Sequence, residues 1–331
     1  MAPLQGSLQG VERIIISPDG ALNLIPFAAL VDEHDAYLVE HVTISYVTSG
    51  RDLTRFREFG SNPSRDVTPP IIVANPSFNG LRVAPRVVVS ATSATTRAFD
   101  ARVLEPTRHF DALPGTAQEA AALVRLLPGA RLYAGAEATE ALLKTLRGPS
   151  ILHIATHGFF LRPRSAPRTI ASAQGGSRPS PSAGAVIERE DALVLSGLAL
   201  AGANRRSSGD GEDGLLTALE VAGLDLWGTR MVVLSACESG LGDARGGEGV
   251  YGLRRALVLA GSESQVMSLW KVSDIATRNL MIDFYGRLRS GEGRADALRN
   301  VQLAMLHGKR TYIHPFYWAS FIQSGDWRAL N

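Results

Sequence analysis

The chain of 331 residues contains a single cysteine, Cys237. One cysteine cannot form an internal disulfide or a zinc site built from several cysteines, so we expect a reducing, cytoplasmic environment. Apolar runs long enough to cross a bilayer, about 18 residues, are also missing. The first ten residues, MAPLQGSLQG, have neither the basic start nor the apolar centre of a signal peptide. These absences predict a cytoplasmic chain with no membrane partner.

Lysine is scarce as well. It occurs only at Lys144, Lys271 and Lys309, and arginine supplies the rest of the 34 basic residues. The arginines are scattered among 32 acidic residues, which leaves a net charge of +2. Nucleic-acid-binding proteins usually concentrate basic residues in one stripe, so we expect no direct nucleic-acid binding. An apolar content of 45% is that of a globular chain with one large or two small domains.

The cysteine itself follows a buried strand. The run MVVL at residues 231–234 is short, apolar and rich in valine, and Cys237 comes just after it, where the sequence turns to glycine. Reacting groups of open α/β sheets collect at the carboxyl ends of the strands. Cys237 is therefore either a nucleophile or a buried structural cysteine.

A second apolar strand ends in a histidine. The run SILHIATHGFF, residues 150–160, places His157 before a glycine, in the same way that MVVLSAC places Cys237. If the two strands are parallel neighbours about 4.8 Å apart, the imidazole and the thiol come within working distance of each other. This is the arrangement of a cysteine hydrolase. His153 lies deeper in the same strand, and we interpret it as a core histidine bonded to a neighbour.

These blocks resemble a known family. The strands ending in HG and ACESG are similar to those of the caspase and legumain clan of cysteine proteases. The ordered blocks ILHIATHGFF, VVLSACESGLGD, VMSLWKVSD and HPFYWASFIQSGDW, among others between Val11 and Trp327, resemble the bacterial CHAT domain, which is often fused to tetratricopeptide repeats (TPR). The resemblance implies a cysteine endopeptidase with a dyad of His157 and Cys237.

The expected fold class is α/β, with a caspase-like, mostly parallel sheet flanked by helices and an N-terminal β-rich subdomain. We place the N-terminal part at residues 1–68, with a hairpin-like β unit over 11–48, and the protease domain at 69–331. Strands and helices alternate in the second part, which favours a parallel sheet. Thr116 to Glu119 is predicted to be a capping box that opens a helix ending before Pro128-Gly129, and Thr217 to Glu220 is predicted to be a second capping box. No 34-residue repeat is present, so the chain is a stand-alone form or a piece of a longer protein.

A segment rich in Pro, Ser, Gly and Arg interrupts the protease domain at about 162–186. Its composition predicts a disordered segment or a mobile lid. The range from Arg162 to Arg178 is either a processing site, by analogy with caspases, or a solvated loop.

One motif points elsewhere. Gly247, Gly249 and Gly252 form G-x-G-x-x-G, a dinucleotide-binding pattern. A spacer of several residues separates these glycines from the preceding strand, whereas the dinucleotide motif follows its strand directly. The alternative is a glycine-rich loop that opens a helix with Leu253, Leu257 and Ala260 on its packed stripe.

Three residues are candidates for the substrate pocket. By resemblance, the strand tip SLWKVSD lines the pocket for the side chain before the scissile bond, which makes Trp270 a wall and Asp274 the charge that selects a basic side chain. Asp274 and Ser273 also suit the first turn of the helix that follows. Glu238 comes directly after the nucleophile, where it contributes to the pocket or only shapes the turn.

The sequence thus predicts peptide hydrolysis through a thioester on Cys237, with His157 as acid and base. By resemblance, the backbone N–H groups of Gly158 and Cys237 hold the oxyanion. We expect no cofactor and no metal. The partners are a protein or peptide substrate and a TPR-type sensor or other regulator that activates the enzyme. The alternative is a catalytically inactive CHAT-fold module that acts as an adaptor.

Overall fold

The structure is a computed structural model that describes residues 10–59, 68–80, 109–160, 193, 195–209, 211–235, 237–238, 247–270, 272–308 and 310–330. For residues 57–59, 237–238, 247–250 and 310 it describes the backbone alone. The insert expected at about 162–186, including the candidate processing site, lies outside the described residues.

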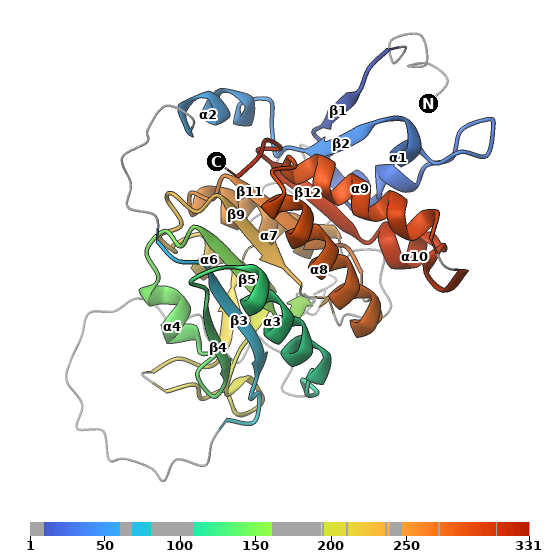
Figure 1. Cartoon of the computed structure of the whole chain (residues 1–331). Coiled ribbons are helices and arrows are strands. Elements are labelled where there is room, and N and C mark those ends of the chain that lie inside the picture. The colour runs from blue at the N-terminus through green and yellow to red at the C-terminus, as the bar shows by residue number, and fades with distance from the viewer. Residues whose placement is uncertain are drawn as a thin grey trace, which may run out of the picture.

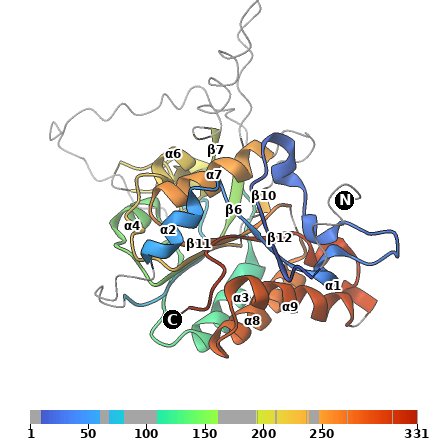
Figure 2. The ribbon, with the colours of Figure 1, turned by 90° about the horizontal axis from the view of Figure 1, so that it is seen from above.

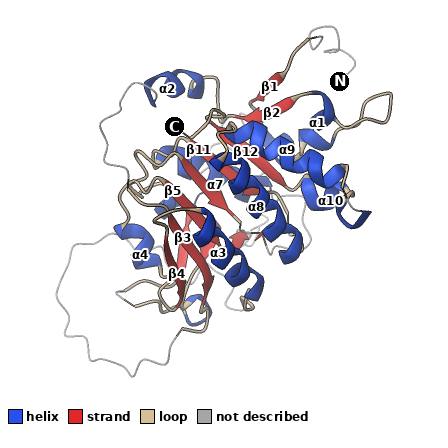
Figure 3. Ribbon diagram, viewed as in Figure 1, coloured by secondary structure: helices blue, strands red, loops and turns tan. Residues whose placement is uncertain are grey.

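Two β-sheets run through the described part of the chain (Figures 1 and 3). The larger has the strand order β1-β2-β12-β11-β9-β5-β3-β4. Its strands are β1 Arg13–Ile16, β2 Thr43–Tyr46, β3 Ile71–Pro76, β4 Arg131–Gly135, β5 Ile151–Ala155, β9 Met231–Leu234, β11 Ser264–Ser268 and β12 Phe321–Gly325. Neighbouring strands are parallel, except that β11 and β12 are antiparallel. The predicted mostly parallel sheet is confirmed.

Helices cover both faces of this sheet, as Figure 2 shows from above. One face carries α3 (Pro114–Leu126), α8 (Asp274–Arg289) and α9 (Arg294–Leu306). The other face carries α4 (Glu140–Thr145), α6 (Ala218–Val221) and α7 (Gly247–Leu259). The remaining α-helices of the described part are short: α1 Leu38–His41, α2 Asp52–Phe59 and α10 Pro315–Trp318. None of the described helices combines the length and apolarity needed to span a bilayer.

The central strands are buried on both faces, as expected for a sheet between two helix layers. Alternate residues of β5 and β9 enter two separate cores. Leu152 and Val232 pack with the α4, α6 and α7 side, and Ile151 and Met231 pack with the α3, α8 and α9 side. Packing on both faces holds β5 and β9 in a fixed position and orientation within the sheet.

The smaller sheet continues the two central strands. Its order is β10-β6-β7-β8, with β10 Cys237–Glu238, β6 His157–Phe160, β7 Ser196–Ala199 and β8 Leu215–Thr217. β6 follows β5, and β10 follows β9, at the same edge of the larger sheet, because β5 is parallel to β9 and β6 is parallel to β10. The polar residues that end both apolar strands therefore enter this second sheet together.

Helix α3 begins earlier than predicted. Pro114 opens it, which suits proline because the first turn needs no backbone N–H donor. Thr116 is not a cap: its Oγ1 donates to the carbonyl of Leu113 and accepts from the N–H of Asn75. The capping box predicted at Thr116 to Glu119 is therefore wrong, whereas the second Thr/Glu box, Thr217 to Glu220, does cap α6.

The hairpin-like unit predicted over 11–48 is also wrong. β1 and β2 pair in parallel, so the chain must cross over between them. The crossover contains two 3-10 helices, Gly20–Leu24 and Phe27–Ala29, and then α1. Its apolar run LNLIPFAAL packs as tight turns around Pro26 and forms no strand.

Candidate active site

His157 and Cys237 lie opposite each other on neighbouring parallel strands. In the larger sheet, Ile151 pairs with Met231, and in the smaller sheet His157 pairs with Cys237, so the register continues without a slip. Neighbouring strands are about 4.8 Å apart, and paired residues of parallel strands present their side chains on the same face. The expected adjacency of the two strands is confirmed.

His157 is buried, with 7% of its surface exposed. Its Nε2 lies 2.9 Å from the carbonyl oxygen of Asp111. A carbonyl only accepts, so Nε2 carries the proton and Nδ1 is the accepting nitrogen of the neutral ring. The rings of Phe78 and Phe110 pack against the imidazole, with centroids 5.2 and 5.7 Å away. The geometry fixes both the plane and the tautomer of the ring.

Asn204 holds the segment that carries the Asp111 carbonyl. Its Oδ1 accepts from the N–H of Phe110 at 2.8 Å, and its Nδ2 donates to the Phe110 carbonyl at 3.0 Å. Its own N–H donates to the carbonyl of Phe78 at 2.9 Å. Asn204 thereby connects both aromatic neighbours of His157.

A pocket opens beside His157, between the first turns of α3 and α8. Ser235 and Thr156 line it at the ends of the two central strands. The residues that line it are Leu113, Gly115, Thr116, Glu119, Thr156, His157, Ser235, Val272, Asp274 and Thr277. Its two carboxylates, with no lysine or arginine among these lining residues, suit a positively charged group.

The three predicted pocket residues have different places. Asp274 lines this pocket, and it is also the first residue of α8, with its side chain against Gly115. Trp270 is not among the lining residues described above: its indole donates to the carbonyl of Phe316 at 3.0 Å, beside α10. The backbone of Glu238 pairs with Gly158, and its side chain lies outside the described part.

His153 is a core residue, as predicted. It is fully buried, and its Nδ1 lies 3.1 Å from the hydroxyl of Tyr285. Its Nε2 lies 3.0 Å from a carboxylate oxygen of Glu119. Both ring nitrogens therefore lie close to polar atoms of the core, although the contact between Nε2 and Glu119 does not have hydrogen-bond geometry.

The G-x-G-x-x-G glycines lie in α7 itself, which begins at Gly247. They do not form the tight turn between strand and helix that a dinucleotide phosphate needs. Leu253, Leu257 and Ala260 are buried in the core, as the alternative interpretation predicted.

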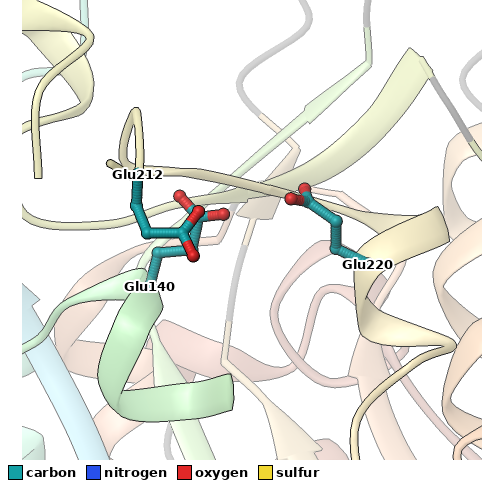
Figure 4. A group of neighbouring side chains, drawn as sticks. All are labelled: Glu140, Glu212 and Glu220. Atoms are coloured by element: carbon teal, nitrogen blue, oxygen red, sulfur yellow. The ribbon is translucent and has the colours of Figure 1, made fainter. Parts of the chain in front are cut away.

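One cluster of charges went unnoticed in the sequence. Glu140, Glu212 and Glu220 converge from α4, a loop and α6 (Figure 4). Their carboxylate oxygens are close enough together to hold a metal ion. The ammonium of Lys144, however, already lies 2.8, 2.8 and 3.0 Å from one oxygen of each. Because a cation is already in place, we assign the cluster a structural role.

Burial changes the acidity of this cluster. It raises the pKa of Glu140 to about 7 against the lowering effect of Lys144. The pKa of Glu220 is lowered, although burial raises it, because its carboxylate accepts from the N–H and hydroxyl of Thr217 and from Lys144. The N–H of Gly214 donates to Glu140 at 3.0 Å.

A family model described as the CHAT domain matches residues 1–326 of the chain. Tetratricopeptide repeat protein 28 of Homo sapiens is 27% identical over 341 residues, and that of Mus musculus is 24% identical over 351 residues. Each alignment covers 100% of this chain but only 13% of the relative, so the chain spans a small part of their length.

Among solved structures, the Arg-specific cysteine proteinase gingipain R has a TM-score of 0.50 at 9% identity, over 99% of this chain and 66% of that one. The Saccharomyces cerevisiae separase–securin complex has a TM-score of 0.46 at 12% identity, over 94% of this chain and 15% of that one. At such low identity, the likeness to gingipain R shows a shared fold alone.

Proposed function

The chain belongs to the CHAT domain family, and from this premise we propose that it is a caspase-like cysteine endopeptidase, with Cys237 as nucleophile and His157 as acid and base. The observation that carries the proposal is the pairing of these two residues on parallel strands at the edge of the sheet. The hydrogen bond from His157 to the carbonyl of Asp111 supports it, because this bond keeps the proton of the neutral ring on Nε2 and so makes Nδ1 the basic nitrogen.

The reaction has two stages. His157 takes the thiol proton of Cys237 as the sulfur bonds to the peptide carbonyl carbon, and it then delivers this proton to the leaving amine as the C–N bond breaks. Water attacks the thioester while His157 takes one of its protons, and this proton passes to the sulfur as the C–S bond breaks, which restores the thiol. The Asp111 carbonyl stabilises the imidazolium that forms in between, because its oxygen accepts from the charged ring.

The developing oxyanion is proposed to lie against the N–H groups of Gly158 and Cys237. Removing one such donor typically costs about 2.7 to 4 kcal/mol of transition-state stabilisation. Asp274, at the pocket beside His157, is proposed to select a basic side chain before the scissile bond. Asp274 is also the first residue of α8, where its negative charge interacts favourably with the positive end of the helix dipole.

We further propose that the enzyme acts in the cytoplasm on protein substrates and is activated by a partner or sensor domain. Support for a sensor comes from the relatives, which are named as tetratricopeptide repeat proteins and are much longer than this chain.

The second candidate is a non-catalytic adaptor that uses the same fold. The match to these repeat proteins favours it, since TPR arrays in general bind other proteins through their extended concave surface. The presence of both Cys237 and His157 favours the enzyme, because an adaptor needs neither.

A thiol-directed probe separates the two. We expect a peptidyl chloromethylketone with a basic side chain next to the reactive group to label the wild-type protein and not Cys237→Ala. The same probe with an acidic side chain at that position should label the wild-type protein more slowly. Cleavage of a peptide library should be lost in Cys237→Ala. Labelling that is equal in both proteins, with no cleavage, would overturn the peptidase proposal in favour of the adaptor.

A further inference from the structure

A buried carboxylate lies behind the proposed site. Glu119, on α3, is 2% exposed, yet it lines the pocket that contains His157. One of its oxygens lies 3.0 Å from Nε2 of His153, and the other accepts from the hydroxyl of Ser235 at 3.1 Å. Burying such a charge is costly, and an apolar replacement of similar size often serves stability as well. Its position therefore suggests a role besides stability.

Ser235 marks the place where β9 leaves the larger sheet. Its N–H still donates to the carbonyl of Ile154 at 2.9 Å, as in the ladder of the parallel strands. Two residues later, Cys237 pairs with His157 in the smaller sheet. Ser235 is therefore the last described residue after β9 before Cys237 enters the smaller sheet.

The histidine strand has a comparable anchor at its own bend. The hydroxyl of Thr156, directly before His157, donates to the carbonyl of Ala199 on β7. Each strand is thus tied by a hydroxyl at the point where it passes from one sheet to the other. For the cysteine strand, the tie is the carboxylate of Glu119.

We propose that Glu119 is a positioning residue for Cys237, acting through the hydroxyl of Ser235. The bond fixes the bend after β9 and so holds Cys237 in register with His157. His153 keeps the Glu119 carboxylate turned toward Ser235. This inference deepens the proposed peptidase function and rests on it.

The test compares two variants, each of which loses the hydroxyl of one buried serine. Ser235→Ala removes the hydrogen bond to Glu119. Ser264→Ala is the matched control, because Ser264 in β11 is also buried and donates to the carbonyl of Arg230, away from the pocket. For each variant, kcat and KM are measured on a basic peptide. The rate of alkylation by iodoacetamide is followed by mass spectrometry, which reports a single site because Cys237 is the only cysteine.

We expect Ser235→Ala to lower kcat and the alkylation rate roughly tenfold or more, with KM little changed, since small misplacements of reacting groups have large effects on rate. Ser264→Ala should leave both rates at the wild-type level. Glu119→Leu should match Ser235→Ala, and Glu119→Gln, which keeps an acceptor for the hydroxyl, should retain more activity.

The double variant Glu119→Leu with Ser235→Ala decides whether the two residues act as one unit. We expect it to be no slower than either single variant. Fully additive losses, or a Ser235→Ala variant as fast as Ser264→Ala, would overturn the positioning role. A wild-type chain that cleaves no peptide and is labelled by the peptidyl chloromethylketone no faster than Cys237→Ala would refute the proposed peptidase, while the iodoacetamide rates would still decide whether Glu119 positions Cys237.

Discussion

At the scale of single residues, the two histidines of β5 and β6 differ in what surrounds them. His157 lies beside the pocket at the edge of the sheet, whereas His153 is enclosed by Tyr285 and Glu119. We therefore expect His157→Ala to abolish peptide cleavage and to lower the melting temperature less than His153→Ala does, because His157 packs against two phenylalanine rings but is not paired with a buried carboxylate.

His153→Ala should instead lower the melting temperature first, because it leaves a cavity and a buried carboxylate without its partner. Peptide cleavage assays and circular dichroism melts of both variants provide the measurement. A folded His153→Ala protein without activity, beside an active His157→Ala protein, would show that the base is assigned wrongly.

Asn204 offers a second test at this scale. Asn204→Asp keeps the shape of the side chain but points a carboxylate oxygen at the carbonyl of Phe110, where the amide donated a hydrogen bond. The repulsion should displace Asp111 and loosen His157, which we expect to lower kcat roughly tenfold.

Asn204→Gln serves as the comparison variant, because it keeps the neutral amide but places it on a side chain that is one methylene longer. The pH profile of Cys237 alkylation should shift in Asn204→Asp if the hydrogen bond of His157 is disturbed. An unchanged profile together with an unchanged kcat would contradict a role for Asn204 in orienting the base.

The sequence could predict that Cys237 and His157 lie on neighbouring strands, but not which groups surround His157. Cys237 and His157 end two apolar strands, and strand ends meet at one edge of a parallel sheet, so their proximity follows from the pattern. The hydrogen-bond partner of His157 Nε2 is the backbone carbonyl of Asp111, and every residue type has a carbonyl. No residue pattern could have identified it.

At the scale of secondary-structure elements, the charges around Lys144 join α4 to the loop before β8 and to α6. Glu140 has a pKa raised to about 7, so its folded form binds a proton more tightly than its unfolded form. The stability it contributes is complete below its unfolded pKa of 4.5 and is lost as pH rises through about 7.

We expect Glu140→Gln to reduce the fall in the free energy of unfolding between pH 5 and pH 8, by an amount on the order of 1 kcal/mol. Urea titrations at the two pH values measure this difference. Glu137→Gln, an exposed carboxyl near the same helix, controls for the loss of one acid. Equal pH dependence in Glu140→Gln and wild type would show that Glu140 is not the titrating group.

Element boundaries were predicted well where local chemistry decides them. Pro128-Gly129 follows the end of α3, and Thr217 with Glu220 caps α6, as their residue types indicate. Thr116 and Glu119 have the same pattern but are used by Asn75, Ser235 and His153. Tertiary contacts override the local signal there, and a single sequence does not show them.

At the scale of the whole molecule, the N-terminal segment belongs to the same sheet as the proposed site. β2 pairs with β12, and Arg13 forms an ion pair with Asp296 at 2.9 Å. Arg299 donates to the carbonyls of Val39 and Glu40. We predicted a separate N-terminal part, residues 1–68, from a change in composition along the chain. Composition does not show which strands become neighbours in a sheet.

The last prediction concerns a chain shortened to residues 69–331. Among the described residues before this point, five large apolar side chains are buried, which are Val39, Val42, Tyr46, Val47 and Phe56. Burial of such side chains stabilises a fold by about 1.5 to 3 kcal/mol each, so their loss costs roughly 7 to 15 kcal/mol. This equals the whole stability of a typical domain, about 5 to 15 kcal/mol. We therefore expect the shortened chain to show no cooperative melt, whereas a cooperative melt with retained Cys237 labelling would mean that residues 69–331 fold as an independent domain.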